Sequence, residues 1–291
     1  MARIAIGCVQ FGLNYGVSNT TGKPGVTEIK EIVELATEHG VSVYDTAPAY
    51  GESEIALGET LHGNEKIVTK TPIFKETKIS NIHVRKLRSV FLESLCKLKR
   101  SKLYGLLIHN ADDLNKPGSD ALYTEMLRLK EEEKIKKIGV SIYSSIHLDN
   151  VLKNYDIDLV QLPVNIFDQR LIQSGHLSRL KNLEIEVHSR STFLQGLLIM
   201  KPEERPMYFL NYQKQLNKYF ARIQNLGMTS LKAALGFVQA LPQVDQIIVG
   251  VNSTSQLKEI FQASGAQVNP ENFLDIAIAD TSLIDPSLWK L

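Results

Sequence analysis

Four side chains capable of acid–base chemistry stand at or just after three short apolar runs of the chain. Asp45, Lys70 and His109 lie at the ends of these runs, and Tyr50 follows in the loop after the first. A phenol with a pKa of about 10 is a poor catalyst at neutral pH, but a nearby ammonium lowers that pKa. We therefore predict a relay from Asp45 through Lys70 to Tyr50, with Tyr50 as proton donor to a carbonyl oxygen. His109 is predicted to hydrogen-bond the same oxygen and orient it.

These four residues leave alternatives open. Taken singly, each has a more ordinary explanation. An Asp after a strand is often a turn residue, a Lys a surface charge, a His part of the core, and a loop Tyr a packing residue. Those explanations weaken together because Lys70 and His109 end apolar runs, where an unpaired charge is costly. Carbonyl reduction also needs a hydride that no side chain supplies, which implies a nicotinamide cofactor. Lys70 can instead form a Schiff base, as in aldolases, and a nicotinamide-binding regulatory barrel with little turnover is a third interpretation.

Eight short apolar runs, separated by helix-periodic segments, must position these side chains. The candidate strands cover 3–9, 41–46, 66–71, 103–109, 137–142, 158–163, 184–189 and 246–251. Most are continuous apolar stretches, which is typical of parallel strands covered by helices. The repeat predicts an α/β fold of the closed TIM (β/α)₈ barrel type. The rival, an open doubly wound sheet, usually carries a G-x-G-x-x-G motif after its first strand, and this sequence has none.

The chain has 291 residues, more than the roughly 200–250 of an ordinary α/β barrel. We expect the surplus in an enlarged loop after strand seven, between Ser189 and Gln246, and in a C-terminal tail over 268–291. One extra element is expected over 206–226 of that loop. Neither segment has enough apolar residues for a core of its own. The prediction is one domain over 1–291, with both segments at or beside the mouth of the barrel.

Composition excludes several classes of protein. The chain is 43% hydrophobic with a net charge of +1, so disorder is excluded and neither nucleic acid nor a membrane surface is expected as a partner. Its two cysteines, Cys8 and Cys96, give neither a disulfide framework nor metal-site spacing. No secretory signal or membrane-spanning stretch is evident, so we expect a cytoplasmic protein. Its partner would be a small carbonyl or alcohol substrate, and the chain a monomer or weak homo-oligomer.

A resemblance to a known family adds to this interpretation. Over almost its whole length the sequence resembles the aldo-keto reductases, in the blocks GCVQFG at 7–12, YDTAPAYG at 44–51 with SE at 53–54, TK at 69–70, IH at 108–109, GVS at 139–141, Gln161, Asn165, FLQGLL at 193–198 and VGVNS at 249–253. The block at 44–51 is the most specific. The family is a TIM barrel that uses NADP(H), less often NAD(H), to interconvert carbonyls and alcohols. The resemblance implies that Asp45, Tyr50, Lys70 and His109 form the catalytic tetrad, with Tyr50 as the general acid.

The resemblance also implies a set of residues that bind the cofactor. Ser141 and Gln161 correspond to those that hold the nicotinamide carboxamide, and the segment after strand seven to those that line the nicotinamide and pyrophosphate. The adenosine phosphate is expected at the helix that starts near 252–256, since helix N-termini bind anions. The implied cofactor-binding residues are Cys8, Ser141, Gln161, Arg190, Ser191, Phe193, Gln195, Gly250, Asn252, Ser253 and Gln256.

Three positions depart from the family pattern. Ile142 stands where an asparagine usually contacts the carboxamide, and Arg190 replaces an aromatic that stacks on the nicotinamide. A planar guanidinium can stack in its place. No basic residue precedes Lys258 in the segment where NADP(H)-selective members commonly have one. Family habit alone favours NADP(H), with NAD(H) as the alternative.

Overall fold

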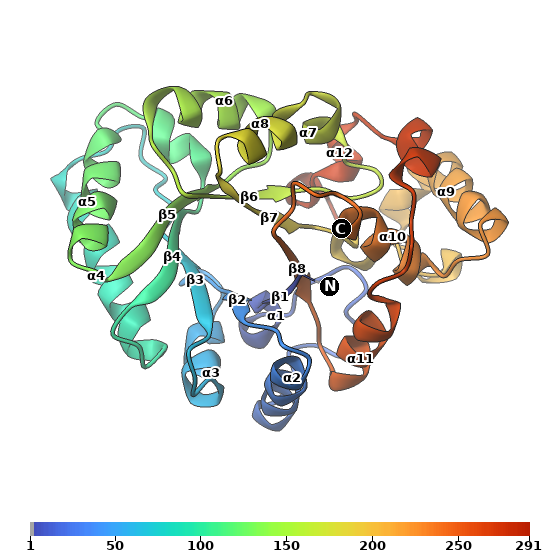
Figure 1. Cartoon of the computed structure of the whole chain (residues 1–291), viewed down its shortest axis with the longest axis horizontal. Coiled ribbons are helices and arrows are strands. Elements are labelled where there is room, and N and C mark those ends of the chain that lie inside the picture. The colour runs from blue at the N-terminus through green and yellow to red at the C-terminus, as the bar shows by residue number, and fades with distance from the viewer. Residues whose placement is uncertain (1–2) are drawn as a thin grey trace.

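Eight parallel strands form a closed barrel in sequence order, β1 to β8 (Figure 1). This computed structural model describes residues 3–291, so the first two residues of the range 1–291 lie outside the described residues. The strands are β1 Ile4–Gly7, β2 Val43–Asp45, β3 Lys66–Lys70, β4 Leu103–Ile108, β5 Ile135–Ser141, β6 Leu159–Pro163, β7 Glu186–Arg190 and β8 Gln246–Gly250. Each pairs in parallel with its neighbours, and β8 closes on β1. The predicted barrel is confirmed.

Apolar side chains cover both faces of the strands, which explains their continuous hydrophobic runs. One small cluster, made only of residues from strands, fills the barrel: Ala5, Val43, Val68, Leu107, Leu159 and Ile248, with Tyr104 packed against it. The much larger second cluster joins the outer strand faces to the helices. In α2 (Val26–Glu38), for example, Ile29, Ile32 and Val33 are buried at the spacing of one helix face.

The helices surround the barrel (Figure 1). Besides α2, they are α1 Val9–Gly12, α3 Ser53–Thr60, α4 Asn81–Lys97, α5 Asp120–Glu131, α6 Ser145–Asn154, α7 Arg170–Gln173, α8 His176–Asn182, α9 Gln213–Asn225, α10 Ser230–Gln239, α11 Thr254–Ala263 and α12 Thr281–Ile284. Within residues 3–291, none of these helices combines the length and apolar character needed to cross a bilayer.

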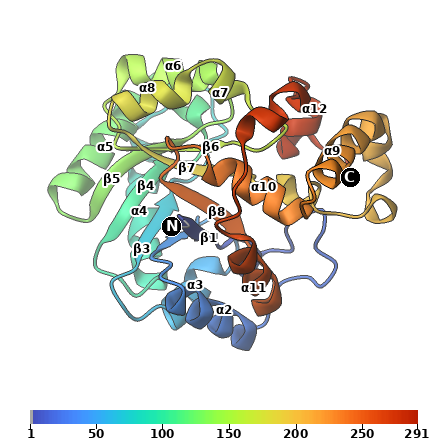
Figure 2. The same cartoon turned by 45° about the vertical axis from the view of Figure 1, so that its right-hand side comes forward.

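The connection between β7 and β8 contains short 3₁₀ turns, α9 and α10. The extra element expected over 206–226 consists of a 3₁₀ turn, Met207–Tyr212, followed directly by α9. The tail packs against this connection: the Tyr208 hydroxyl donates to the Ser282 carbonyl at 2.7 Å, and the rings of Phe209 and Trp289 meet at 4.8 Å. Figure 2 accordingly shows α12 beside α9, on the outer side of the barrel.

Candidate active site

The four residues predicted to do chemistry meet at the carboxyl end of the strands. Lys70, at the end of β3, donates to both carboxylate oxygens of Asp45 at 2.7 Å and to the Thr46 carbonyl at 2.9 Å. Its ammonium nitrogen lies 4.9 Å from the centre of the Tyr50 ring. The Tyr50 ring meets the His109 ring edge-on at 5.9 Å. We call Asp45, Tyr50, Lys70 and His109 the mouth cluster.

Lys70 is almost completely buried, and its surroundings keep it charged. Burial works to lower the pKa of Lys70, but the negative charge of Asp45 and the Tyr50 hydroxyl outweigh it, so the pKa is raised. Hydrogen bonds to the Asp45 carboxylate and to the Thr46 carbonyl also hold the ammonium in place. A Schiff base needs a neutral, accessible amine, and Lys70 is not among the residues that line the cavity described below. The geometry therefore disfavours the aldolase interpretation.

Burial and the neighbouring ammonium act on the pKa of Tyr50 in opposite directions. Burial raises it, while the positive charges of Lys70 and Arg190 lower it, and the net result lies above the ordinary value of 10.0. The predicted lowering of the pKa by the Lys70 ammonium is present, but the loss of water around the phenol outweighs it. Tyr50 is therefore a protonated phenol at neutral pH, the form that can donate a proton.

His109 is held neutral. Burial, followed by the positive charges of Lys70 and Arg190, lowers the pKa of His109 to about 3. The Nδ1 atom of its ring is buried and has no hydrogen-bond partner among residues 3–291. His109 thus presents an uncharged imidazole beside the Tyr50 ring, suited to hydrogen-bond a carbonyl oxygen without repelling a second cation.

Two glycines fix the loop that carries Tyr50. Gly51 has a φ of +57°, a conformation that favours glycine. A Cβ atom on Gly12, at the end of α1, would lie 1.7 Å from the Tyr50 carbonyl oxygen. The backbone of this turn therefore packs directly on α1, which leaves Tyr50 little freedom to move.

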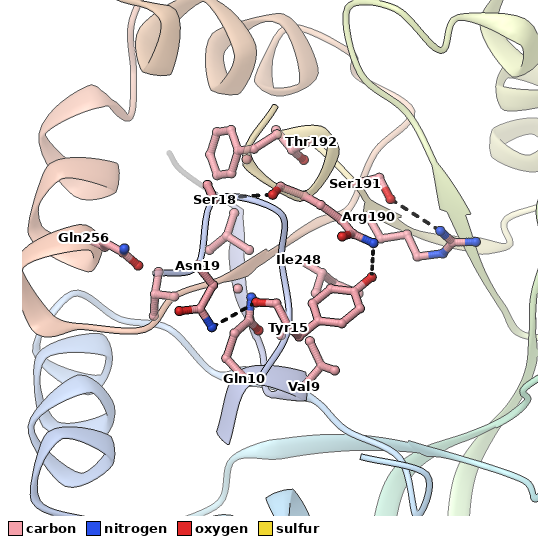
Figure 3. A pocket seen from close by; sticks show the side chains of 18 of the residues that line it. Val9, Gln10, Tyr15, Ser18, Asn19, Arg190, Ser191, Thr192, Ile248 and Gln256 are labelled. Carbon is pink, nitrogen blue, oxygen red and sulfur yellow. Dashed lines mark hydrogen bonds between the residues drawn. The ribbon is translucent and has the colours of Figure 1, made fainter. Parts of the chain in front are cut away.

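A cavity of about 610 Å³ opens beside the mouth cluster. One end is lined by Asp45, Tyr50 and His109, and the other by the start of α11. Figure 3 shows Gln256 and Arg190 on opposite sides of it. Most of the residues predicted to bind the cofactor line this cavity: Ser141, Gln161, Arg190, Ser191, Phe193, Gln195, Gly250, Asn252 and Gln256.

Two of the predicted residues do not line it. Cys8 is fully buried beneath the cavity, with its thiol 3.5 Å from the Ile6 carbonyl. Ser253 caps α11 by accepting from the Gln256 backbone N–H at 3.2 Å. Any contribution of these two side chains to ligand binding is therefore indirect.

Two predicted residues have partners that the sequence did not suggest. The Gln161 side chain reaches across the barrel and donates to Asp45 Oδ1 at 2.7 Å. Arg190 donates to the Ile142 carbonyl at 3.0 Å, and its guanidinium lies 4.0 Å from the centre of the Tyr143 ring. Arg190 stands where an aromatic residue was expected, and its guanidinium packs on the aromatic ring of Tyr143.

Orphaned polar atoms show what kind of ligand the cavity suits. Four residues that line the cavity each contain one buried polar atom with no hydrogen-bond partner among the described residues: Gln10 Oε1, His109 Nδ1, Thr192 Oγ1 and Asn252 Oδ1. Buried polar groups without partners are costly and uncommon. They extend from the mouth cluster to the start of α11, so they fit a long polar molecule such as a nicotinamide dinucleotide. Within residues 3–291, no group of three or more His, Cys, Asp or Glu side chains is arranged to hold a metal.

Sequence reasoning missed several lining residues. Tyr143 lies two residues after Ser141, and the alternation of a strand could have placed it on the same side. Thr192 lies between the predicted residues Ser191 and Phe193, and Gln10 lies two residues after Cys8. The C-terminal tail, expected at or beside the mouth, forms no part of the cavity wall, since none of the described residues after Ile260 lines it. The tail packs outside, on the β7–β8 connection.

Comparisons with known proteins agree with this geometry. The model of the aldo/keto reductase family matches residues 3–280. The chain is 24% identical over 283 residues to the aldo-keto reductase YhdN of Bacillus subtilis, covering 88% of this chain and 85% of that protein. It is 22% identical over 287 residues to D-arabinose 1-dehydrogenase of Saccharomyces cerevisiae, covering 87% and 83%. Among solved structures, the holo form of aldo-keto reductase AKR11C1 from Bacillus halodurans aligns with a TM-score of 0.78 at 19% identity, covering 99% and 95%.

Proposed function

The chain belongs to the aldo/keto reductase family, and from that premise we propose that it reduces an aldehyde or ketone to an alcohol with Tyr50 as the proton donor. Membership makes it an NAD(P)H-dependent oxidoreductase. When bound, the nicotinamide supplies the hydride that the side chains cannot. The substrate is a small carbonyl compound, or the alcohol in the reverse direction.

Two members of the mouth cluster, Tyr50 and His109, are placed to act on the oxygen of a carbonyl substrate. Tyr50 holds its proton at neutral pH and gives it to the carbonyl oxygen as negative charge develops there. His109, being neutral, hydrogen-bonds the same oxygen and orients it between the two rings. The observation that carries the proposal is the edge-on contact of the Tyr50 and His109 rings at the wall of one cavity, with the Lys70 ammonium behind Tyr50.

Lys70 and Asp45 assist the proton transfer without contacting the substrate. When Tyr50 has given up its proton, the Lys70 ammonium stabilises the phenolate that remains. Asp45 keeps Lys70 charged and fixed through two hydrogen bonds. The amide of Gln161 holds one of the carboxylate oxygens in turn. Both side chains are almost completely buried, so solvent screens their charges less than it would at the surface.

The remaining lining residues are proposed to hold the dinucleotide. Ser141, Gln161 and the Arg190–Tyr143 pair would contact the nicotinamide half, because they lie at the Tyr50 end. Gly250, Asn252 and Gln256 would contact the adenosine half. The missing side chain of Gly250 makes room for Gln10, because a Cβ atom on Gly250 would lie 2.2 Å from the Gln10 side chain. Membership in the family leaves the choice between NADP(H) and NAD(H) open.

The substitution Tyr50→Phe tests the proposal. It should lower kcat for the reduction of small aldehydes by about 10²–10⁴-fold while the Kd of the dinucleotide stays unchanged, because the ring remains and only the donated proton is lost. The measurement is steady-state kinetics with NADH and NADPH, next to calorimetry on the same variant. Unchanged reduction by the variant would refute the role of Tyr50. A wild-type protein that binds a dinucleotide and reduces no carbonyl compound would support the regulatory interpretation instead.

A further inference from the structure

The cavity wall carries one positive charge that has no counter-ion. Arg190 is the one lysine or arginine that lines the cavity in the part of the chain that the structure describes, residues 3–291. The carboxylate of the mouth cluster, Asp45, is bonded to Lys70 instead. Glu204 and Glu259 also line the cavity, and neither forms an ion pair with Arg190. A partly buried cation without a partner is costly, so it calls for an explanation.

The guanidinium of Arg190 is held in place by uncharged neighbours. One terminal nitrogen donates to the Ile142 carbonyl at 3.0 Å and the other to the Ser191 hydroxyl at 3.4 Å, while the Tyr143 ring lies 4.0 Å away against one face. These contacts orient the cation without cancelling its charge. They use one hydrogen on each terminal nitrogen. The Nε–H and a second hydrogen on each terminal nitrogen have no partner among residues 3–291.

This charge acts at the end of the cavity where the carbonyl group is expected. Arg190 lines the same cavity as Tyr50 and His109, and its positive charge works to lower the pKa of both side chains. The guanidinium therefore lies within electrostatic reach of both rings. Because Asp45 neutralises Lys70, Arg190 leaves this end of the cavity with an excess positive charge.

The nicotinamide does not supply the missing negative charge. Its carboxamide is uncharged, and its ring is neutral when reduced and positively charged when oxidised. The phosphates of the dinucleotide are separated from that ring by a ribose. A substrate held by Tyr50 and His109 occupies the end of the cavity that Arg190 lines. Carboxylate and phosphate groups match the free edge of a guanidinium, since each accepts two parallel N–H bonds.

We propose that the carbonyl substrate carries a carboxylate or phosphate group, which Arg190 binds while Tyr50 and His109 hold the carbonyl oxygen. The inference rests on the proposed function and names the substrate class of the same site. The edge of the guanidinium makes these bonds, so the Tyr143 ring on its face does not block them. Arg190 is thus the residue that sets specificity, and it takes no part in the proton transfer.

Matched pairs of substrates, one anionic and one neutral, test the proposal. Suitable pairs are glyoxylate with methyl glyoxylate, succinic semialdehyde with methyl 4-oxobutanoate, and glyceraldehyde 3-phosphate with glyceraldehyde; the last pair separates phosphate from carboxylate. We expect the wild-type protein to show a higher kcat/KM for the anionic member of at least one pair. Rising ionic strength should lower that kcat/KM and leave the value for the neutral partner nearly unchanged.

Substitution of Arg190 gives the deciding comparison, because the two members of a pair also differ in intrinsic reactivity. Arg190→Gln should lower the anionic-to-neutral ratio of kcat/KM by about 10–100-fold, mainly through KM, since bonds to a charged partner are lost. Arg190→Lys keeps the charge without the planar fork and should fall between the two proteins. Arg85→Gln, at an exposed position of α4 outside the cavity, removes the same charge and should leave the ratio unchanged.

A binding measurement complements the kinetics. Calorimetry with 4-hydroxybutanoate and with 1,4-butanediol, each added to protein already saturated with NADH or NADPH, reports affinity without turnover, because an alcohol and a reduced dinucleotide do not react. Arg190→Gln should weaken the binding of 4-hydroxybutanoate about 10–100-fold and affect the diol much less. The Kd of the dinucleotide itself is measured on the same variant.

The outcomes separate this inference from the proposed function. A protein that reduces no carbonyl compound would overturn both. Wild-type protein that prefers the neutral member of every pair, or a ratio that Arg190→Gln leaves unchanged, would overturn the anionic substrate and leave the reductase proposal intact. Weaker dinucleotide binding with an unchanged ratio would assign Arg190 to the cofactor and likewise overturn the inference. Should Arg190→Gln not fold, Arg190→Lys and the dependence on ionic strength decide in the same way.

Discussion

The two ends of the barrel hold the same four kinds of side chain in different arrangements. Near the amino ends of the strands, one carboxylate gathers all the donors: Glu186 accepts from the Tyr104 hydroxyl at 2.7 Å, from His188 at 2.8 Å and from the Lys137 ammonium. We call Tyr104, Lys137, Glu186 and His188 the amino-end cluster. These bonds outweigh the opposing effect of burial and lower the pKa of Glu186 to about 2.

In the mouth cluster the Asp45 carboxylate binds the lysine but neither the tyrosine nor the histidine. Asp45 holds Lys70 and the Gln161 amide, while Tyr50 and His109 face the cavity. The amino-end cluster lines no part of that cavity. In α/β barrels the carboxyl-end face carries activity and the opposite face carries stability. The comparison teaches that residue types alone do not make an active site: reactivity requires a tyrosine and a histidine that the carboxylate leaves free.

Lys70→Met should break the mouth cluster most severely. We expect kcat to fall by about 10³-fold, because the phenolate left by proton transfer loses its stabilising charge. The variant should also lose stability, since Asp45 remains buried without a counter-ion. The double variant Asp45→Asn with Lys70→Met should regain stability, measured by urea unfolding, and stay inactive. Recovery of activity in the double variant would show that Lys70 acts only as a structural partner of Asp45.

Glu186→Gln, in the amino-end cluster, should lower stability and leave activity nearly unchanged. It leaves Lys137 and His188 beside a neutral amide, and we expect the free energy of unfolding at pH 7 to drop by about 3 kcal/mol. A carboxyl whose pKa falls from 4.5 to about 2 on folding stabilises the protein above pH 4.5 and loses that effect as the pH falls. The variant should therefore lose stability less steeply than wild type below pH 4.5, with kcat within about twofold of wild type. A large loss of kcat in a folded variant would contradict the division between the two clusters.

The pH dependence of reduction should show the smallest effect. Because the pKa of His109 is about 3 rather than 6.5, protonation of this ring should produce no break in kcat/KM near pH 6.5. The pKa of Tyr50, raised above 10.0, should likewise keep the alkaline limb above that value. Steady-state kinetics across the range, with His109→Gln as the reference, provides the check. An acid limb near pH 6.5 that disappears in the variant would mean that His109 ionises in the working enzyme.

Much of the barrel could be read from the sequence because its signals are local. Continuous apolar runs at strand positions predicted all eight strands, with boundaries displaced by a few residues, as at β7. Placing Asp45, Lys70 and His109 at strand ends was enough to predict that they meet, since the strand ends of a parallel barrel share one mouth. The position of the tail was not predictable in this way. Its contacts with the β7–β8 connection, such as Tyr208 to Ser282, join distant parts of the chain.

The sequence by itself determined the fold, the mouth cluster and the family, because each depends on residue type and spacing. The tertiary structure decided the protonation state of Tyr50, which depends on how much water burial removes from the phenol. It also decided that Gln161 holds Asp45 across the barrel, and that the Glu28 carboxylate reaches Thr254. Those contacts bring together residues that lie far apart along the chain, so the local sequence around one partner does not predict the other.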